Sequence, residues 1–303
     1  GADLYKAAIS LSNLMKEIGI AADGGKDSLS MAASAGDEVV KAPGQVVISA
    51  YSSMKDITRV ITPDIKKPGA SRLLFIDLAE GKNRLGGSAL AQALGQIGDE
   101  SPDVENPVLL VNAFKAVQEM IKKNLILSGH DRSDGGLITT LVEMALSGSC
   151  GIEVELAGEE EIIKEDAIIP CLFSEELGLV LEYLPQNESK IAGILNRSSI
   201  PFIVLGNTCK RKQVIIRNGK KVILDTGTPE LLNWWESTSD QLERCQMNVQ
   251  LADEQKQNHN RAGLSYNISF KPAITPLVLL NRPNKPEVAI IREEGSNGDR
   301  EMA

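Results

Sequence analysis

The sequence predicts a mixed α/β fold, and three observations lead to that prediction. Short apolar runs typical of strands alternate with amphipathic helical patterns along most of the chain. Of the 303 residues, 42% are hydrophobic and 24% are charged, which is an ordinary balance for a globular protein. That length is sufficient for one large or two medium domains. We therefore expect helices and strands to share substantial hydrophobic cores.

Charge and cysteine usage exclude several classes of function. The net charge is −9, and the clustered Lys and Arg residues of a nucleic-acid-binding surface are missing. The chain has no apolar run near the roughly 18 residues that a membrane span requires. Four scattered cysteines and two histidines indicate neither a zinc site nor a disulfide framework. We expect a soluble cytoplasmic chain with reduced thiols, whose partners are small molecules or other domains.

The first 69 residues are predicted to contain a helix, a polar loop and two strands. Apolar residues from Leu4 to Ile18 share one helical face, and Gly19 is placed to end the helix. The following loop contains Lys26 and Asp27 beside two glycines. A lysine in this setting can meet a phosphate, although a plain turn is the commoner interpretation. Residues 46–51 and 57–61 are rich in strand-forming residues, and Pro and Gly near residue 69 indicate a domain boundary.

The segment from residue 70 to 245 is predicted to form a complete α/β domain. Asn218-Gly219 is a strong hairpin signal between its last two strands. The expected strands are 73–78, 125–127, 150–156, 179–183, 202–205, 213–217 and 222–224; the expected helices begin near residue 88 or run through 114–121, 137–145, 191–194 and 229–245, the last with Trp234 and Trp235 as packing residues.

The stretch from Ser128 to Gly136 is the strongest candidate for a functional site. It concentrates a histidine, an arginine, a serine and two aspartates before a predicted helix. Backbone N–H groups and the helix dipole favour phosphate at such a position, and Asp131 and Asp134 supply the hard oxygen ligands that magnesium takes. An ordinary helix cap followed by a glycine turn explains the same residue types, so both interpretations stay open.

Two further polar stretches are candidates with equally ordinary alternatives. Arg84, Gly86 and Gly87 precede a helix that begins near Ser88, an arrangement that can hold an anion or form a plain capped turn. The adjacent carboxylates Glu175 and Glu176 can bind a cation or lie in a solvated turn.

The last part of the chain is predicted to be a linker followed by the start of a new folded segment. Residues 246–286 are rich in Asn, Gln, Pro and Lys, which indicates an extended linker. Residues 288–291 read as a buried strand, followed by a helix start at Arg300. Because one strand and part of a helix cannot fold alone, we expect a further domain to follow.

Six motifs, taken together and in order, resemble one family. They are GGKDSLSM at 24–31, VVISAY at 46–51, RLGGSALAQ at 84–92, GHDRSDGGL at 129–137, FSEELGLVLE at 173–182 and IREEGSNGDREMA at 291–303. The set is similar to the large, single-chain phosphoribosylformylglycinamidine synthases. The resemblance implies domains of the aminoimidazole ribonucleotide synthetase-like (PurM-like) fold: residues 1–69 end an ATP-binding N-terminal domain, 70–245 form the C-terminal domain, 246–286 are a linker and 287–303 begin a class I glutaminase domain.

The resemblance also implies a reaction and a set of site residues. ATP activates formylglycinamide ribonucleotide, and ammonia released from glutamine displaces phosphate to give the amidine in purine biosynthesis. The family's magnesium ligand and nucleotide contact fall on Asp131 and Ser133. Lys26 matches a loop that serves the nucleotide, and Arg84, Gly86 and Gly87 match a glycine-rich loop to which we assign phosphate.

The resemblance places much of the complete enzyme outside this sequence. The other magnesium ligands, the first synthetase half and the glutaminase triad have no match here, so no residue is assigned a catalytic role. We expect packing on those missing parts. For this chain alone we expect weak or no ATP binding and no amidine formation. Two alternatives remain: a structural nucleotide-binding half without turnover, and another enzyme of the superfamily, of the selenophosphate synthetase or thiamine-phosphate kinase type.

Overall fold

The computed structural model describes residues 1–26, 28, 30–54, 56–158, 162–258, 267–271 and 273–292. The chain divides into two units, residues 1–259 and residues 260–303. In the second unit, the described residues include one short helix, α9 (Leu277–Leu280). Within the part of the chain that the structure describes, no helix has the length and apolar character needed to traverse a bilayer.

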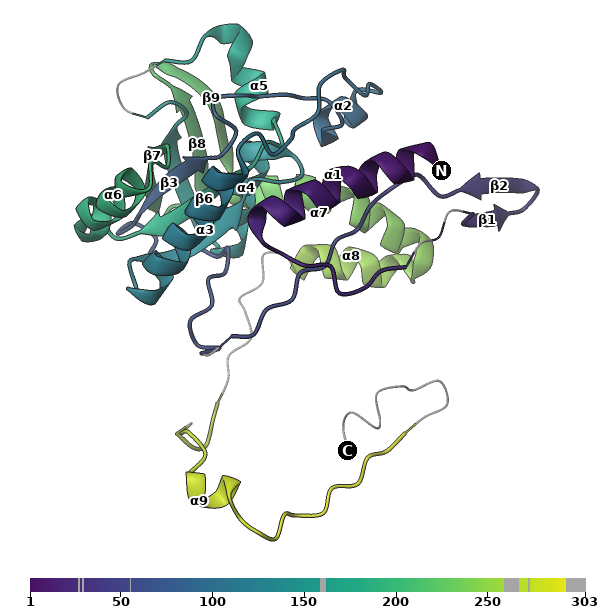
Figure 1. Ribbon diagram of the computed structural model, residues 1–303, viewed down its shortest axis with the longest axis vertical. Helices are drawn as coiled ribbons and strands as arrows, with labels where there is room; N and C mark the ends of the chain where they lie inside the picture. Colours follow the sequence, from purple (N-terminus) through teal and green to yellow (C-terminus); the bar gives the residue numbers. More distant parts are fainter. Residues whose placement is uncertain are drawn as a thin grey trace. The chain divides into compact units, whose positions relative to one another are not determined.

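A mixed sheet is the centre of the first unit (Figure 1). Among the described residues it has seven strands in the order β4-β6-β3-β7-β5-β8-β9, and only the pair β5–β8 is parallel. All seven predicted strands of the 70–245 segment are confirmed, and so is the Asn218-Gly219 hairpin. The strands are β3 (Arg72–Asp77), β4 (Ile126–Asp131), β5 (Gly151–Glu155), β6 (Gly178–Tyr183), β7 (Phe202–Cys209), β8 (Gln213–Asn218) and β9 (Lys221–Gly227).

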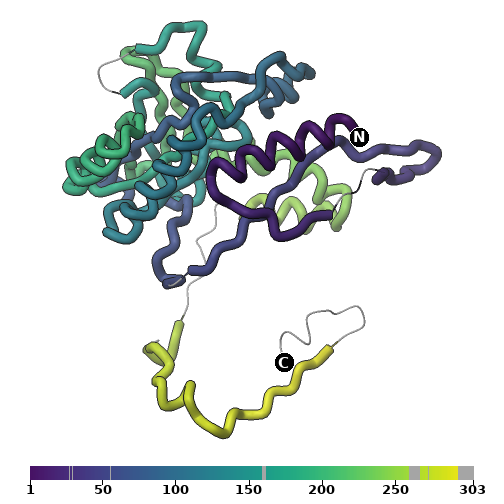
Figure 2. Tube along the Cα trace, viewed as in Figure 1, coloured from purple at the N-terminus to yellow at the C-terminus, as the bar shows by residue number. Residues whose placement is uncertain are grey.

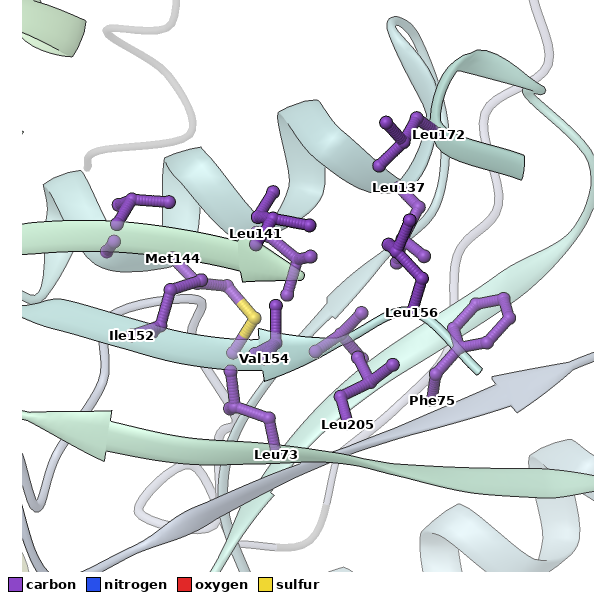
Figure 3. Close-up of a cluster of buried hydrophobic side chains, with 14 of the residues drawn as sticks. Leu73, Phe75, Leu137, Leu141, Met144, Ile152, Val154, Leu156, Leu172 and Leu205 are labelled. Atoms are coloured by element: carbon purple, nitrogen blue, oxygen red, sulfur yellow. The ribbon is translucent and has the colours of Figure 1, made fainter. Parts of the chain in front are cut away.

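Strand β3 shows how the sheet separates two hydrophobic cores. Successive side chains of a strand point to opposite faces, so Leu73 and Phe75 join one core whereas Leu74 and Ile76 join the other. In the first core, helix α4 (Gly136–Ser147) packs its apolar face on the sheet beside α5 (Ile168–Phe173), as Figure 3 shows. The predicted helix after the Ser128–Gly136 stretch is thus confirmed.

The second core lies between the opposite face of the sheet and two other helices. Helix α3 (Pro107–Lys122) contributes Ala113 and Met120, and α6 (Glu188–Arg197) contributes Ile191 and Leu195. Asn106 caps α3 by accepting the N–H of Leu109. The unit is therefore a sheet covered by helices on both faces.

The N-terminal part confirms one prediction and contradicts another. Helix α1 (Ala2–Ile18) ends at Gly19, whose φ of 76° is the left-handed value that suits glycine. A small hairpin, β1 (Ala32–Ala35) with β2 (Glu38–Lys41), follows. The strands predicted at 46–51 and 57–61 are not strands, because their described residues are largely exposed and none pairs with a neighbouring strand. A strand-forming composition needs a paired, half-buried surface to become a strand.

The segment after β9 is more helical than predicted. Helix α7 (Thr228–Gln246) confirms the predicted helix, and the chain then reverses into α8 (Val249–Gln257), inside the expected linker (Figure 2). Trp234 and Trp235 are 57% and 55% exposed, so the prediction that they pack inside is wrong. Three short helices complete the described elements: α2 (Ala89–Ala93), η1 (Glu165–Ala167) and η2 (Pro185–Asn187).

Residues 288–291 do not form the predicted strand. They belong to the second unit and have no strand partner among the described residues. The predicted helix start at Arg300 lies outside the described residues.

A buried carboxylate joins the sheet to the segment that enters it. Glu182, on β6, is fully buried. Its two oxygens accept the backbone N–H groups of Lys66 and Lys67 and the hydroxyl groups of Ser71 and Ser128, at 2.6–2.9 Å. Four donors offset the cost of removing this carboxylate from water.

Gly136 allows the start of α4 to pack closely against the backbone at the end of α5. Its φ is 76°, and a Cβ built on it would lie 2.6 Å from the carbonyl oxygen of Leu172. A side chain at this position would therefore meet backbone atoms, which cannot move as a flexible side chain does.

Replacing Glu182 by glutamine should destabilise the first unit. The amide NH2 cannot accept the hydrogen bonds that one carboxylate oxygen accepts, so buried donors lose their acceptor, at a cost of roughly 3 kcal/mol or more. Chemical denaturation would measure the change. Glu153→Gln on β5, whose carboxylate is 54% exposed, is the control and should alter stability by less than about 1 kcal/mol. Equal effects at the two positions would contradict the assigned role of Glu182.

Two glycine-to-alanine substitutions should change the stability of the first unit in opposite directions. Gly136→Ala combines backbone strain with overpacking and should destabilise by about 2–4 kcal/mol. Gly193→Ala lies inside α6 with no atom within 4 Å of the added Cβ, and should stabilise by about 0.5–1 kcal/mol because alanine is the better helix former. Thermal unfolding of both variants measures this, and a neutral Gly136→Ala would contradict the tight packing.

Candidate functional site

The Ser128–Gly136 stretch forms the end of a strand, a short loop and the start of a helix. His130 and Asp131 are the last residues of β4 and pair with Val180 and Leu179 of β6. The loop predicted to include them thus begins later, at Arg132. Its entry is fixed because the N–H of Arg132 donates to the carbonyl oxygen of Gly178 at 2.8 Å.

Arg132 is a structural residue of this loop. Its side chain is almost completely buried and lies over the Phe75 ring, 4.8 Å from the ring centroid. The guanidinium donates to the carbonyl oxygens of Glu176 and Leu177 and to Asp77, at 2.5, 2.9 and 3.2 Å. Burial lowers the pKa of this guanidinium, and the charge of Asp77 opposes that shift.

The candidate metal ligand Asp131 faces solvent. Its carboxylate is 67% exposed, and one of its oxygens lies 3.2 Å from Nδ1 of His130. The other ring nitrogen, Nε2, lies 2.8 Å from Glu143 on α4. Ser133 and Asp134 are exposed as well. The residues available to an approaching ligand are therefore a carboxylate, a hydroxyl and a second carboxylate on one short loop.

Asp131 has few neighbours of its kind for holding a cation. Within the described ranges, no group of three or more His, Cys, Asp or Glu side chains is arranged to hold a metal ion. An exposed carboxylate beside a hydroxyl nevertheless fits Mg²⁺, which binds proteins through one or two carboxylates and keeps water and phosphate oxygens as its other ligands.

The glycine-rich loop at Arg84 lies beside the Ser133 loop. The carboxylate of Glu175 accepts the N–H of Ala89, at the start of α2, and the N–H of Gly135, before α4, each at 2.8 Å. Gly86 and Gly87 belong to the first loop, and the N–H groups of these glycines donate to the carbonyl oxygens of Glu100 and Ile97 at 2.6 Å. Three of the sequence motifs therefore meet at one place.

Arg84 is engaged by two carboxylates. Its Nε and Nη2 donate to Glu176 at 2.5 and 2.9 Å, and its Nη1 lies 2.7 Å from Glu105. Burial alone would raise the pKa of Glu176, but the hydrogen bonds and charge of Arg84 outweigh it and lower that pKa. A cavity of about 770 Å³ opens beside this loop and is lined by Lys82, Arg84, Gly86, Asp99, Glu100 and Ser101 among others.

Lys26 lies elsewhere on the chain. It belongs to the exposed segment between α1 and β1, where its ammonium group donates to Ser28. Asp27, the other polar candidate in this motif, lies outside the described residues.

Sequence reasoning missed the part that Glu175 and Glu176 play. It offered a cation site or a solvated turn, whereas Glu176 is buried against Arg84 and Glu175 caps two loops. The available signal was an acidic pair immediately before an apolar strand, in a chain that also holds arginines before two glycine-rich turns.

Two family models match the chain. Residues 73–218 match the C-terminal domain of AIR synthase related proteins, and residues 1–53 match the FGAR-AT PurM_N-like domain. A solved structure, T. maritima PurL complexed with FGAR, aligns with 88% of this chain and 38% of its own, with a TM-score of 0.52 and 15% identity. The predicted aminoimidazole ribonucleotide synthetase-like fold is thereby confirmed.

The sequence relatives are more specific. This chain is 46% identical over 305 residues to the probable phosphoribosylformylglycinamidine synthase, chloroplastic/mitochondrial, of Arabidopsis thaliana, and 43% identical over 313 residues to the phosphoribosylformylglycinamidine synthase of Homo sapiens. Both alignments cover all of this chain but only 21% and 23% of the relatives. The whole chain is therefore homologous to one segment of the phosphoribosylformylglycinamidine synthases, as its motifs predict.

Proposed function

We propose that this chain is part of an ATP-dependent ligase that forms formylglycinamidine ribonucleotide from formylglycinamide ribonucleotide, glutamine and ATP. One observation carries the proposal: the similarity to named synthases extends over the entire chain at 46% identity. The T. maritima PurL structure, which shares the fold, is a complex with FGAR and is consistent with the same substrate. We propose that the ammonia that replaces oxygen in this reaction comes from glutamine, released in the glutaminase domain that is expected to begin at residues 287–303.

Within this segment we assign a metal and nucleotide role to the loop after β4. Asp131 is the proposed Mg²⁺ ligand, and the hydroxyl of Ser133 is the proposed nucleotide contact. Mg²⁺ bound there would neutralise phosphate oxygens of ATP. The exposure of both side chains supports the assignment, since a bound nucleotide must reach them.

The glycine-rich loop supplies the proposed phosphate side of the site. Arg84 and Gly86 border the cavity, and Gly87 follows Gly86 in the loop. The N–H groups of both glycines already donate to carbonyl oxygens of the chain, so we propose that the glycines give this loop the shape with which it faces phosphate. Because Arg84 is held by Glu176 and Glu105, its charge is already compensated, so we assign it to the shape of the loop as well as to phosphate. Lys26 remains a proposed nucleotide contact.

The other partners and the compartment are proposals as well. We propose that this segment packs on the first synthetase half and on the glutaminase domain of the complete enzyme. The composition predicts the cytoplasm, whereas the Arabidopsis relative is named as chloroplastic/mitochondrial.

The isolated chain should bind MgATP weakly or not at all, and it should form no amidine. A metal that stabilises a transferring phosphoryl group must be held from several sides, and Asp131 supplies one of them. Calorimetric titration with MgATP measures the affinity. A dissociation constant in the micromolar range would contradict the prediction and show that this segment holds a complete site.

In the complete protein, Asp131→Asn should weaken MgATP or MgADP binding by roughly tenfold or more, since it removes a direct ligand and even indirect partners of a metal contribute 10–100-fold. Ser133→Ala should weaken binding less, because it removes one neutral hydrogen bond. Equilibrium dialysis with and without EDTA measures both. Asp166→Asn, exposed on η1, is the matched control. Unchanged binding in Asp131→Asn would refute the assignment of the metal.

The same preparation separates turnover from a structural role. Nucleotide that copurifies with the complete protein and is not consumed during the reaction would assign the Asp131 loop to a structural nucleotide. Nucleotide that exchanges at the catalytic rate would assign it to turnover.

A further inference from the structure

The carboxylate of Glu175 contacts two loops that are distant in the sequence. One oxygen, Oε1, accepts the N–H of Ala89 and the N–H of Gly135, each at 2.8 Å. These partners lie 86 and 40 positions away in the chain. The same oxygen atom therefore fixes the separation of the glycine-rich loop and the Ser133 loop.

The turn that carries Glu175 is itself held in place. On one side, the N–H of Ser174 donates to the carbonyl oxygen of Pro170 at 2.9 Å. Within the turn, the N–H of Glu176 donates to Ser174 Oγ at 3.3 Å, and the Glu176 carboxylate binds Arg84. On the other side, the buried guanidinium of Arg132 donates to the carbonyl oxygens of residues 176 and 177. Because its neighbours are anchored on both sides, Glu175 is presented from a rigid support.

The local backbone explains why an acceptor is needed from elsewhere. Gly135 is the N-cap residue of α4, with φ of 81°, and it has no side chain that can cap the helix. In a capping box, a Glu within the same helix accepts the N–H of the N-cap residue. Here Glu175 accepts that N–H from another part of the chain, and its charge is favoured by the positive end of the α4 dipole.

The hydrogen bond between Glu175 and Gly135 affects the candidate site because Gly135 lies close to Ser133 in the same loop. Ser133 lies two residues before Gly135, and the entry to the same loop is fixed where the N–H of Arg132 meets Gly178. Only Ser133 and Asp134 lie between the two anchored residues. Removing the second anchor would loosen the residues proposed to meet the nucleotide, which would then be held at this end by the bonds from the N–H of Gly136 to the carbonyl oxygen of Ser133 and from the Thr139 hydroxyl to that of Gly135.

We propose that Glu175 is a positioning residue that holds the Gly86–Ser88 turn and the Ser133–Gly135 turn at one separation, so that both address the same ligand. The ligand rests on the proposed function. The positioning itself does not, and it can be measured in this chain without nucleotide. The essential group is the acceptor oxygen of a side chain of this length.

Amide hydrogen exchange, followed by NMR, tests the proposal. Glu175→Ala should speed exchange at Ala89 and Gly135 together by roughly tenfold or more, because both N–H groups lose one acceptor. Glu175→Gln keeps an acceptor oxygen at the same length and should restore protection. Glu175→Asp keeps the charge on a shorter side chain and should fail to restore both. Glu236→Ala on α7 is the control and should leave the two amides unchanged.

The outcomes distinguish this proposal from the proposed function. Unchanged exchange in Glu175→Ala, or acceleration at only one of the two amides, would overturn it. If Glu175→Ala loses protection throughout the sheet, the comparison of Glu175→Gln with Glu175→Asp replaces it as the test. Equal exchange rates at Ala89 and Gly135 in those two variants would overturn the proposal. In the complete protein, Glu175→Ala should raise the KM for ATP, with Gln restoring it. A wild-type complete protein without ATP turnover would refute the proposed function and leave the exchange result standing.

Discussion

Carboxylates lie at one end of strand β6 and in the turn just before its other end, and the rest of the first unit depends on the hydrogen bonds and ion pairs that they make. Glu182, toward one end, is surrounded by four hydrogen-bond donors that bring the 66–71 segment and β4 onto the sheet. Glu175 and Glu176, just before the other end, bind Arg84 and the backbone of two loops. A charge removed from water requires such partners, so each carboxylate organises its surroundings.

The sheet is what makes this arrangement precise. Because β6 pairs with β3 on one side and β4 on the other, the turn before it lies in register with the end of β4. Asp131 therefore leaves the sheet next to the point at which Glu175 and Glu176 enter it. Buried apolar residues on both faces of the sheet hold the strands in place. The exposed loop that follows β4 therefore has room for polar side chains.

Most of the fold could be predicted from the sequence, because periodicity reports which side chains are buried within one segment. The strands of the 70–245 region, the Asn218-Gly219 hairpin and the helix after Gly135 all carry strong local patterns. Residues 46–51 carry an equally strong pattern but form no strand, since pairing depends on a partner that local sequence does not contain. Trp234 and Trp235 differ from their prediction for a similar reason: an aromatic side chain is buried only where a neighbouring element covers it, and these two are largely exposed.

The candidate site was predictable as a set of motifs but not as a geometry. Asp131, Ser133 and the glycines follow from residue types that suit metal and phosphate. The roles of Arg84, Arg132 and Glu175 are different, because each depends on contacts between residues 40 or more positions apart. No spacing rule within one segment reveals such contacts.

The contact of one Glu175 oxygen with both loops also has a consequence for folding. Each turn has a local backbone hydrogen bond, from the N–H of Ser88 to the carbonyl oxygen of Leu85 and from the N–H of Gly136 to that of Ser133, but each also takes an acceptor from Glu175, so its final geometry depends on a distant part of the chain. Contacts between residues distant in sequence carry a large loop-closure cost and tend to form after local ones. Helices and short turns can thus form first, and the ligand-facing loops acquire their final shape when β6 has joined the sheet, where it contributes Val180 to one core and Leu181 and Tyr183 to the other.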